Sequence, residues 1–337
     1  MKQPDMELVG VTKATADYRV DEAQEKGIRV FCLNENDRKP FEESGYAVEG
    51  NLKELLDGCD AVIDCAPKGK GTENLASYSS YPRLKAIFQG GEKHDLTGFS
   101  FNSDCNYEQA AKAAAEGRRF MRVVSCNTTA LCRIMSTLNT NFRIRKVRAC
   151  LVRRSADQSE SDSSVLNSWQ PDTSFPSHHS QDVKTVMPGI SITSLAGIAP
   201  MTLMHGHMLF IEPEKGSDPA TVEGVIETLQ RNPRILVCSS QKGLTSTAKL
   251  KDMFALHNNG RNSDLYEVCV WKEGVGVDAD GEVGLHMAID QQADVVPENI
   301  DAVRAMFNTM PAEESIALTN ASLSIGKIVK NIAYVRK

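Results

Sequence analysis

The chain has 337 residues, of which 41% are hydrophobic and 24% charged, a composition typical of a soluble globular protein with room for two domains. The formal net charge of −6 argues against nucleic-acid binding as the main activity, and no apolar run approaches the roughly 20 residues that a membrane span requires. Nine cysteines without a Cys-x-x-Cys pair, and an N-terminus without the apolar core of a signal peptide, predict a cytoplasmic protein with reduced thiols.

Strands and short helices alternate over the first 124 residues. The predicted strands are residues 6–11, 28–33, 61–66, 84–88 and 120–124, and the predicted helices are residues 17–26, 40–44 and 52–56, with an extended helix over 107–119. This alternation predicts a parallel sheet with helices on both faces. Glycine-bearing loops at residues 67–71 and 89–91 follow two of these strands, where such sheets hold their ligands.

One signal of a nucleotide-binding sheet is missing. Such a sheet normally opens with a strand and a G-x-G-x-x-G turn, but no glycine triplet precedes the strand predicted at residues 6–11. The Gly69-x-Gly71 spacing is too short to replace it. We therefore expect a sheet without its first strand and its main pyrophosphate contacts, with apolar surface exposed, unless the start codon is misplaced.

The stretch Ser125-Cys126-Asn127-Thr128-Thr129 lies between a buried strand and a helix predicted over residues 130–138. The free N–H groups and the positive dipole end of that helix favour a thiolate at Cys126. Asn127, Thr128 and Thr129 are candidates to cap the helix or to donate to an oxyanion. The pattern therefore predicts a nucleophile, while the plainer alternative is that Cys126 is a small apolar core residue.

The second half of the chain predicts a more antiparallel α+β domain. Its predicted strands are residues 147–152, 190–195, 207–211, 234–238 and 266–271, and its predicted helices are residues 220–230, 297–306 and 312–329. A polar, serine-rich surface loop is predicted over residues 157–176.

Seven stretches along nearly the whole chain resemble the archaeal-type (type II) phosphorylating glyceraldehyde-3-phosphate dehydrogenases, and they occur in the family's order. They are residues 122–129 (RVVSCNTT), 88–94 (FQGGEKH), 152–154 (VRR), 176–179 (PSHH), 202–205 (TLMH), 243–248 (GLTSTA) and 296–301 (VPENID). The resemblance implies a Rossmann-type NAD(P)-binding domain, residues 1–124 plus about 308–337, whose C-terminal helix returns to it. It implies a catalytic domain over residues 125–307 and a homotetramer.

The same resemblance assigns site residues. Cys126 resembles the family's nucleophile and His205 its catalytic histidine. Ser125, Asn127 and the pair His178-His179 resemble substrate contacts, the histidines binding the substrate phosphate. The residues that resemble cofactor contacts are Gly91, Arg154 and Gln291.

This chemistry is consistent with the residue types. A thiolate can form a thiohemiacetal with an aldehyde and later leave a thioester, and a histidine with a pKa near neutrality can take the hydroxyl proton. Hydride transfer requires a nicotinamide, and the substrates implied are glyceraldehyde 3-phosphate and inorganic phosphate. His205-x-His207 is also a possible metal half-site, but no third ligand lies at suitable spacing, so no metal is expected.

The choice of cofactor is argued from the end of the first strand. An acidic residue there would bind the ribose hydroxyls and repel a 2′-phosphate, whereas this chain has Thr12-Lys13. Lys13 therefore predicts use of NADP, with NAD also possible.

The chain departs from the family pattern in places. Asp290 precedes Gln291 where the family has histidine, and Ala130 replaces a usual glycine. Two alternatives stay open: a related phosphorylating aldehyde or semialdehyde dehydrogenase, and a non-catalytic binding protein.

Overall fold

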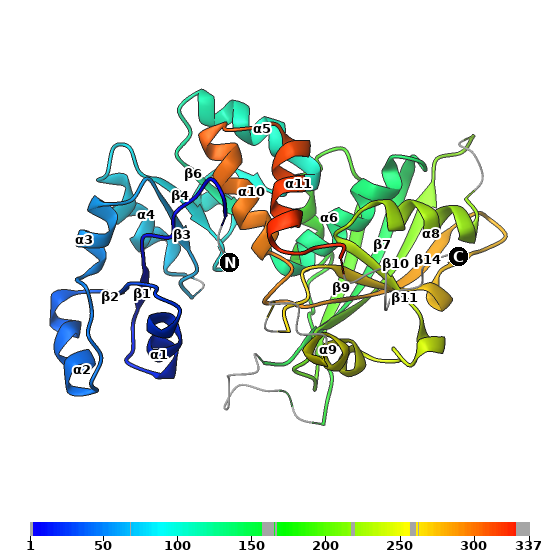
Figure 1. Cartoon of the computed structure of the whole chain (residues 1–337). Helices are drawn as coiled ribbons and strands as arrows, with labels where there is room; N and C mark the ends of the chain where they lie inside the picture. Colours follow the sequence, from blue (N-terminus) through cyan, green and yellow to red (C-terminus); the bar gives the residue numbers. More distant parts are fainter. Residues whose placement is uncertain are drawn as a thin grey trace.

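The computed structural model describes residues 3–67, 69–156, 165, 167–216, 220–256, 261 and 263–327. Figure 1 shows two parts, one formed by the blue and cyan N-terminal elements and the other by green to orange elements around a larger sheet. Of the described helices, none has the length and hydrophobicity needed to cross a membrane.

Short parallel strands and the helices between them build the first part. The strands are β1 (Val11–Lys13), β2 (Val30–Cys32), β3 (Ala61–Asp64), β4 (Lys85–Phe88), β5 (Ser100–Phe101) and β6 (Phe120–Val123). The helices are α1 (Tyr18–Glu25), α2 (Arg38–Glu43), α3 (Leu52–Asp57), α4 (Gly71–Ser79) and α5 (Ser103–Ala115), with short 3₁₀ turns η1 (Glu35–Asp37) and η2 (His94–Leu96).

The parallel strands form two sheets rather than one. β1 pairs with β2, and a separate sheet has the order β3-β4-β6-β5. Among the described strands, none pairs with the free edge of β1 or of β3, and Ile63 on β3 is 41% exposed although it is apolar. Ile63 is therefore an exposed apolar residue at the unpaired edge of β3.

Two local predictions in this part are wrong. The strand predicted at residues 6–11 is instead β1, because the N–H of Val11 donates to the carbonyl of Arg29 (2.9 Å) and Val11 pairs with Val30. Residues 6–10 form no strand pairing. The loop predicted at residues 67–71 leads directly into α4, which the sequence reading missed, and Lys68 lies outside the described residues.

The C-terminal helices α10 (Val296–Phe307) and α11 (Ala312–Ser322) pack beside α5 (Figure 1). An apolar cluster joins α10 to α5 and the four-stranded sheet, and its members include Ile87, Phe101, Met121, Ala302 and Met306. The helix predicted over residues 312–329 ends early, since residues 323–327 are turns and residues 328–329 lie outside the described chain. The domain division at residues 124 and 308 stays a prediction.

A large mixed sheet forms the second part, with the order β11-β12-β14-β10-β7-β9-β8 and with β13 paired to β14. Its strands are β7 (Ile144–Arg154), β8 (Gln170–Pro171), β9 (Ile192–Ala199), β10 (His205–Pro213), β11 (Ile235–Cys238), β12 (Val268–Trp271), β13 (Gly276–Val277) and β14 (Val283–Ile289). Its helices are α6 (Cys126–Asn139), α7 (His178–Lys184), α8 (Val222–Arg231) and α9 (Thr247–Leu256), with 3₁₀ turns η3 (Ser240–Lys242) and η4 (Lys272–Gly274).

The predicted α/β class with a more antiparallel second domain is confirmed, because β10 runs antiparallel to both β7 and β14. The helices α7 and α9 and the strand β14 were missed. The polar loop predicted over residues 157–176 contains β8, and residues 157–164 and 166 lie outside the described chain.

One face of the large sheet is covered and the other is open. Apolar residues of α6, α7 and α8 pack on the covered face in one continuous core. On the open face, Leu195 of β9 and Phe210 of β10 are 53% and 51% exposed. The sheet therefore presents α6 on its buried side, with the start of that helix near the ends of β7, β10 and β14.

Candidate functional site

Cys126 is the first residue of α6, and Val124 and Ser125 separate it from the strand β6. Ser125 has extended backbone angles and caps the helix, because its Oγ accepts a hydrogen bond from the N–H of Thr128 (3.4 Å). The predicted start at residue 130 is therefore wrong by one turn, and Asn127, Thr128 and Thr129 lie inside the first turn rather than at the cap. The cap places Cys126 among the free N–H groups of the helix, as the sequence predicted.

His205 lies opposite Cys126, with its Nε2 3.6 Å from the Cys126 Sγ. It is the first residue of β10, where it pairs with Ile289 at the end of β14. The backbone N–H of Arg154, the last residue of β7, donates to His205 Nδ1 (3.0 Å). Since Nδ1 accepts this bond, the proton of the neutral ring is on Nε2, the atom that faces the sulfur.

The charge states of this pair differ from the sequence expectation. Burial raises the pKa of the Cys126 thiol well above its ordinary value and the charge of Asp294 raises it further, while the N–H of Asn127 and the charge of Arg154 lower it. Burial lowers the pKa of His205 well below its ordinary value, and the neighbouring His207 acts in the same direction. The expected near-neutral pKa for His205 is wrong because the ring is enclosed. The helix terminus favours the thiolate, but burial opposes it more strongly.

Asp294 offers a test of this balance. Its buried carboxylate oxygens have no hydrogen-bond partner among the described residues, and burial raises its own pKa well above the ordinary value. We expect Asp294→Asn to lower the pKa of Cys126, because it removes the negative charge that the carboxyl group adds beside the thiol once the pH exceeds its own raised pKa. A downward shift of about one pH unit would give roughly ten times more thiolate below the midpoint.

The measurement is the alkylation rate of Cys126 by iodoacetamide as a function of pH. Asp252→Asn, on the exposed surface of α9, is the matched control and should leave the profile unchanged. Superimposable profiles for wild type and Asp294→Asn would contradict an electrostatic effect of Asp294.

His178 and His179 begin α7, and their rings lie 3.9 Å apart between centroids. His179 is buried, and its Nδ1 is 2.9 Å from the Ser177 Oγ. Burial lowers the pKa of His179 to about 2, with further contributions from His178 and Arg153. His179 is therefore a neutral hydrogen-bonding group, whereas the side chain of His178 is 64% exposed.

His207 follows two residues after His205 on β10, and the two rings are nearly parallel at 5.8 Å. They share one face of the strand, as the spacing predicted. His207 Nε2 lies 2.8 Å from the Asn127 Oδ1. Among the described residues, no group of three or more His, Cys, Asp or Glu side chains could hold a metal ion.

The first turn of α6 is also tied to α7 and β6. Thr128 Oγ1 donates to Asp182 Oδ2 (2.6 Å), and the other carboxylate oxygen of Asp182 accepts from the guanidinium of Arg122. Arg122 also donates to the Ser100 Oγ (2.8 Å). The sequence reading missed Asp182 and gave Arg122, the first residue of the stretch 122–129, no role, because the contact joins residues about 60 positions apart.

The glycine loops lie at the carboxyl ends of the adjacent parallel strands β3 and β4, as predicted. A Cβ at Gly90 would lie 2.0 Å from the Ala66 carbonyl oxygen, and Gly91 has a φ of +80° with open space around it. The N–H groups of Gly69 and Gly71 are already bonded to the Glu92 carboxylate, at 2.8 and 3.0 Å. Of the two loops, the one at residues 89–91 therefore leaves open space beside Gly91, although the Gly91 N–H already donates to the Gln89 carbonyl (2.8 Å).

Gln291 lies just after β14, in the turn that leads to α10 and near the strand end that pairs with His205. Its Oε1 is buried and has no partner among the described residues, which fits an acceptor for the carboxamide of a nicotinamide. Asp290, which replaces the family's histidine, is held by Lys251 (2.7 Å) and by the N–H of Leu265 (3.2 Å). Together with the open space beside Gly91, the unpartnered Gln291 Oε1 fits a nicotinamide coenzyme.

Lys13 lies at the end of β1, in the separate two-stranded sheet. Its Nζ is 3.2 Å from the carboxylate of Asp17, which caps α1. The structure thus brings together Ser125, Cys126, Asn127, His205 and Arg154. Lys13 is not part of this group, because it lies on β1 in the two-stranded sheet.

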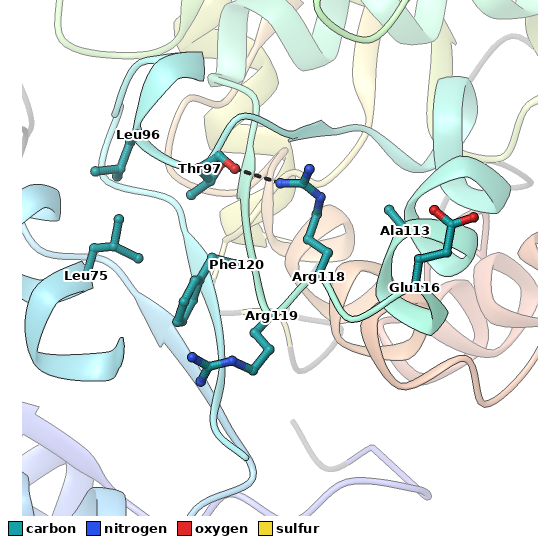
Figure 2. Close-up of a pocket in the computed structure, with 8 residues that line it drawn as sticks. All are labelled: Leu75, Leu96, Thr97, Ala113, Glu116, Arg118, Arg119 and Phe120. Carbon is teal, nitrogen blue, oxygen red and sulfur yellow. Dashed lines mark hydrogen bonds between the residues drawn. The ribbon is translucent and has the colours of Figure 1, made fainter. Parts of the chain in front are cut away.

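A cavity of about 390 Å³ lies elsewhere, between α4, η2, α5 and the start of β6 (Figure 2). Its polar groups include Arg118, which donates to the Thr97 carbonyl (2.7 Å), and Arg119, which stacks on Phe120 at 4.7 Å. None of the predicted site residues lines this cavity. The cavity adjoins Phe120, the first residue of β6, whereas Cys126 lies beyond the other end of that strand.

Known proteins are similar to this chain over nearly its whole length. A glyceraldehyde-3-phosphate dehydrogenase from Archaeoglobus fulgidus is 43% identical over 97% of this chain and 93% of its own length. The chain belongs to the archaeal-type glyceraldehyde-3-phosphate dehydrogenase family. Relatives from Metallosphaera sedula and Methanothermus fervidus are 42% and 41% identical, over 97% and 96% of this chain and 93% of their own lengths.

The family model for the glyceraldehyde 3-phosphate dehydrogenase C-terminal domain matches residues 125–274, so it begins at Ser125. The fold is also similar to aspartate semialdehyde dehydrogenase II from Vibrio cholerae. That structure has a TM-score of 0.60 and 13% identity, and the match covers 94% of this chain and 99% of that one. At this identity the likeness describes the fold alone.

Proposed function

We propose that the protein oxidises D-glyceraldehyde 3-phosphate to 1,3-bisphosphoglycerate, with inorganic phosphate as co-substrate and NADP or NAD as hydride acceptor. The observation that carries the proposal is the pair of Cys126 Sγ and His205 Nε2, 3.6 Å apart at the start of α6, in a chain of this family. A thiol and an imidazole in this geometry suit nucleophilic attack on an aldehyde.

In the proposed reaction, the Cys126 thiolate attacks the aldehyde carbon, and the carbonyl oxygen becomes an oxyanion. The Cys126 thiol first releases its proton to solvent, because His205 Nε2 already carries one. The N–H of Asn127 and the charge of Arg154 favour the resulting thiolate, while burial and the charge of Asp294 oppose it. Because His205 Nδ1 is engaged by the Arg154 N–H, the His205 Nε2–H is the group available to donate to that oxyanion. His205 then acts as a neutral donor, and the oxyanion needs no base before it loses hydride.

The bound nicotinamide supplies the hydride acceptor, and Gly91, Arg154 and Gln291 are the residues proposed to hold it. Hydride loss leaves a thioester on Cys126. Attack by inorganic phosphate on the thioester carbon forms the acyl phosphate and returns the thiolate. Ser125 and Asn127 are proposed substrate contacts, and His178 and His179 are proposed to hydrogen-bond the phosphate of the substrate.

The test is formation of reduced nicotinamide nucleotide from glyceraldehyde 3-phosphate, with and without inorganic phosphate. Activity that depends on both compounds supports the proposal. Equal or greater activity with an unphosphorylated semialdehyde would favour the related dehydrogenase instead, and a folded protein inactive with both would favour a non-catalytic binding role.

For the coenzyme, we propose that Lys13 binds the 2′-phosphate of NADP. The lysine lies at a strand end where the adenosine ribose is expected, although Asp17 competes for its charge. We expect Lys13→Ala to lower kcat/KM for NADP about tenfold, the loss of one charge-assisted hydrogen bond, with little change for NAD. Lys26→Ala, on the exposed end of α1, is the control. Equal losses with both coenzymes would contradict this role.

We further propose that the enzyme works in the cytoplasm as a homotetramer. Support for assembly comes from the open face of the large sheet, where Leu195 and Phe210 are exposed on the two strands that flank β7. Leu195 of β9 lies opposite the exposed Cys150 of β7. Exposed apolar rows on a regular sheet are typical of subunit interfaces. Sedimentation velocity measures the assembly directly.

A further inference from the structure

The motif His205-x-His207 contains a second histidine that the proposed reaction does not use. His207 is 1% exposed, and it shares a strand face with His205. Its one polar contact among the described side chains is from Nε2 to the Asn127 Oδ1, at 2.8 Å. This bond joins β10 to the residue after the nucleophile, across 80 positions of sequence.

The direction of this hydrogen bond is fixed by chemistry. An amide oxygen only accepts, so His207 Nε2 carries the proton and donates it. Burial lowers the pKa of His207 to about 4, so the ring is neutral at physiological pH and remains a donor through Nε2. The oxygen end of the Asn127 amide is therefore directed towards β10.

The other end of the amide follows from this. The Nδ2 group of Asn127 points away from His207 and carries two N–H donors, which form no hydrogen bond with a described residue. Asn127 is the second residue of α6, and its own backbone N–H already interacts with the Cys126 sulfur. The free Nδ2 donors thus belong to the same helix turn as the nucleophile.

We propose that His207 is a positioning residue, which holds the Asn127 amide so that Nδ2–H donates to the substrate oxygen on Cys126. The inference rests on the proposed function, because that oxygen is the one formed by attack of Cys126 on an aldehyde. A reversed amide would turn the lone pairs of Oδ1 towards the developing negative charge, which is repulsive. His207 therefore affects the reaction through Asn127, without touching the substrate.

The experiment compares His207→Leu with His207→Gln in the full-length enzyme. Leucine fills most of the space without a donor, whereas the glutamine amide can donate to Asn127 Oδ1. We expect His207→Leu to lower kcat about tenfold to hundredfold, the effect typical of a group that orients a catalytic contact. His207→Gln should recover most of kcat, and KM for the coenzyme should stay near the wild-type value in both variants.

A double-mutant cycle separates positioning from a general structural effect. Asn127→Ala removes the positioned donor, so the additional change His207→Leu should then cost little more. Thermal unfolding of each variant monitors the fold, and if His207→Leu is unfolded, His207→Gln must still exceed Asn127→Ala in kcat. The proposal would be overturned if the losses of kcat from His207→Leu and Asn127→Ala multiplied in the double variant. Equal losses of kcat in His207→Leu and His207→Gln would also overturn it.

A measurement without substrate keeps this inference distinct from the proposed function. Spectra of protein with ¹⁵N-labelled asparagine contain one side-chain amide signal that Asn127→Ala removes. We expect this signal to shift in His207→Leu and to return towards its wild-type position in His207→Gln. If it does so in an enzyme inactive with glyceraldehyde 3-phosphate, the proposed function fails and the orientation of Asn127 stands; an unchanged signal overturns the positioning role.

Discussion

Replacing Cys126 by alanine is expected to abolish phosphate-dependent formation of reduced nicotinamide nucleotide. The loss in kcat should be on the order of 10⁴-fold or more, because no other described side chain is placed to form the thioester. The His205 Nε2 that lies 3.6 Å from the sulfur would then face an empty position. Initial rates with saturating substrates measure this loss.

A matched control lies on the same helix. Cys132 is fully buried six residues beyond Cys126 on α6. Cys132→Ala should retain nearly wild-type kcat. Alkylation of Cys126 by iodoacetamide should inactivate the wild type and Cys132→Ala alike, and mass spectrometry must identify the modified residue because Cys65 and Cys150 are exposed. Persistent activity in Cys126→Ala would contradict the assignment of the nucleophile.

Replacing Glu298 by glutamine should produce the largest loss of stability. Glu298 has no exposed surface, and its Oε1 accepts from the Arg133 Nη2 (2.8 Å) and the Arg234 Nη1 (3.3 Å). Its Oε2 accepts from the backbone N–H of Ser103 (2.7 Å), which joins α10 to α5. The neutral amide would leave two buried guanidinium groups short of negative charge, so we expect a loss of about 3–5 kcal/mol in the free energy of unfolding.

Urea unfolding at fixed protein concentration measures this loss. The control is Glu73→Gln on α4, which removes an exposed ion pair between Glu73 and Lys70. This substitution should leave the unfolding midpoint unchanged. Equal midpoints for the two variants would show that the buried network contributes little.

The pH dependence provides a second readout. Burial raises the pKa of Glu298, but Arg133 and Arg234 outweigh it, so the folded-state pKa lies below the ordinary 4.5. The stability that the charge provides is therefore present above pH 4.5 and is lost as the pH falls through the folded-state pKa. Glu298→Gln should lose less stability than the wild type over this acidic range.

The local chain determined most of the elements near the site. Apolar runs and glycine loops predicted β3, β4 and β6, and the strand-to-helix junction singled out Cys126 before any tertiary information. These features depend on neighbours within a few residues, so sequence patterns report them well. The family motifs, read in order, indicated the family that the comparisons then established.

Tertiary structure decided the charge states and the long-range contacts. The pKa values of Cys126 and His205 depend on how completely packing excludes water, and a helix terminus alone does not reveal this. Contacts such as His207 with Asn127 join segments about 80 residues apart, and β1 forms only where β2 is available as a partner. The sequence by itself determined which residue could act as a nucleophile and to which family the chain belongs. The folded chain decided which groups surround that nucleophile and which atoms carry the protons, because burial and hydrogen bonding between distant segments arise only on folding.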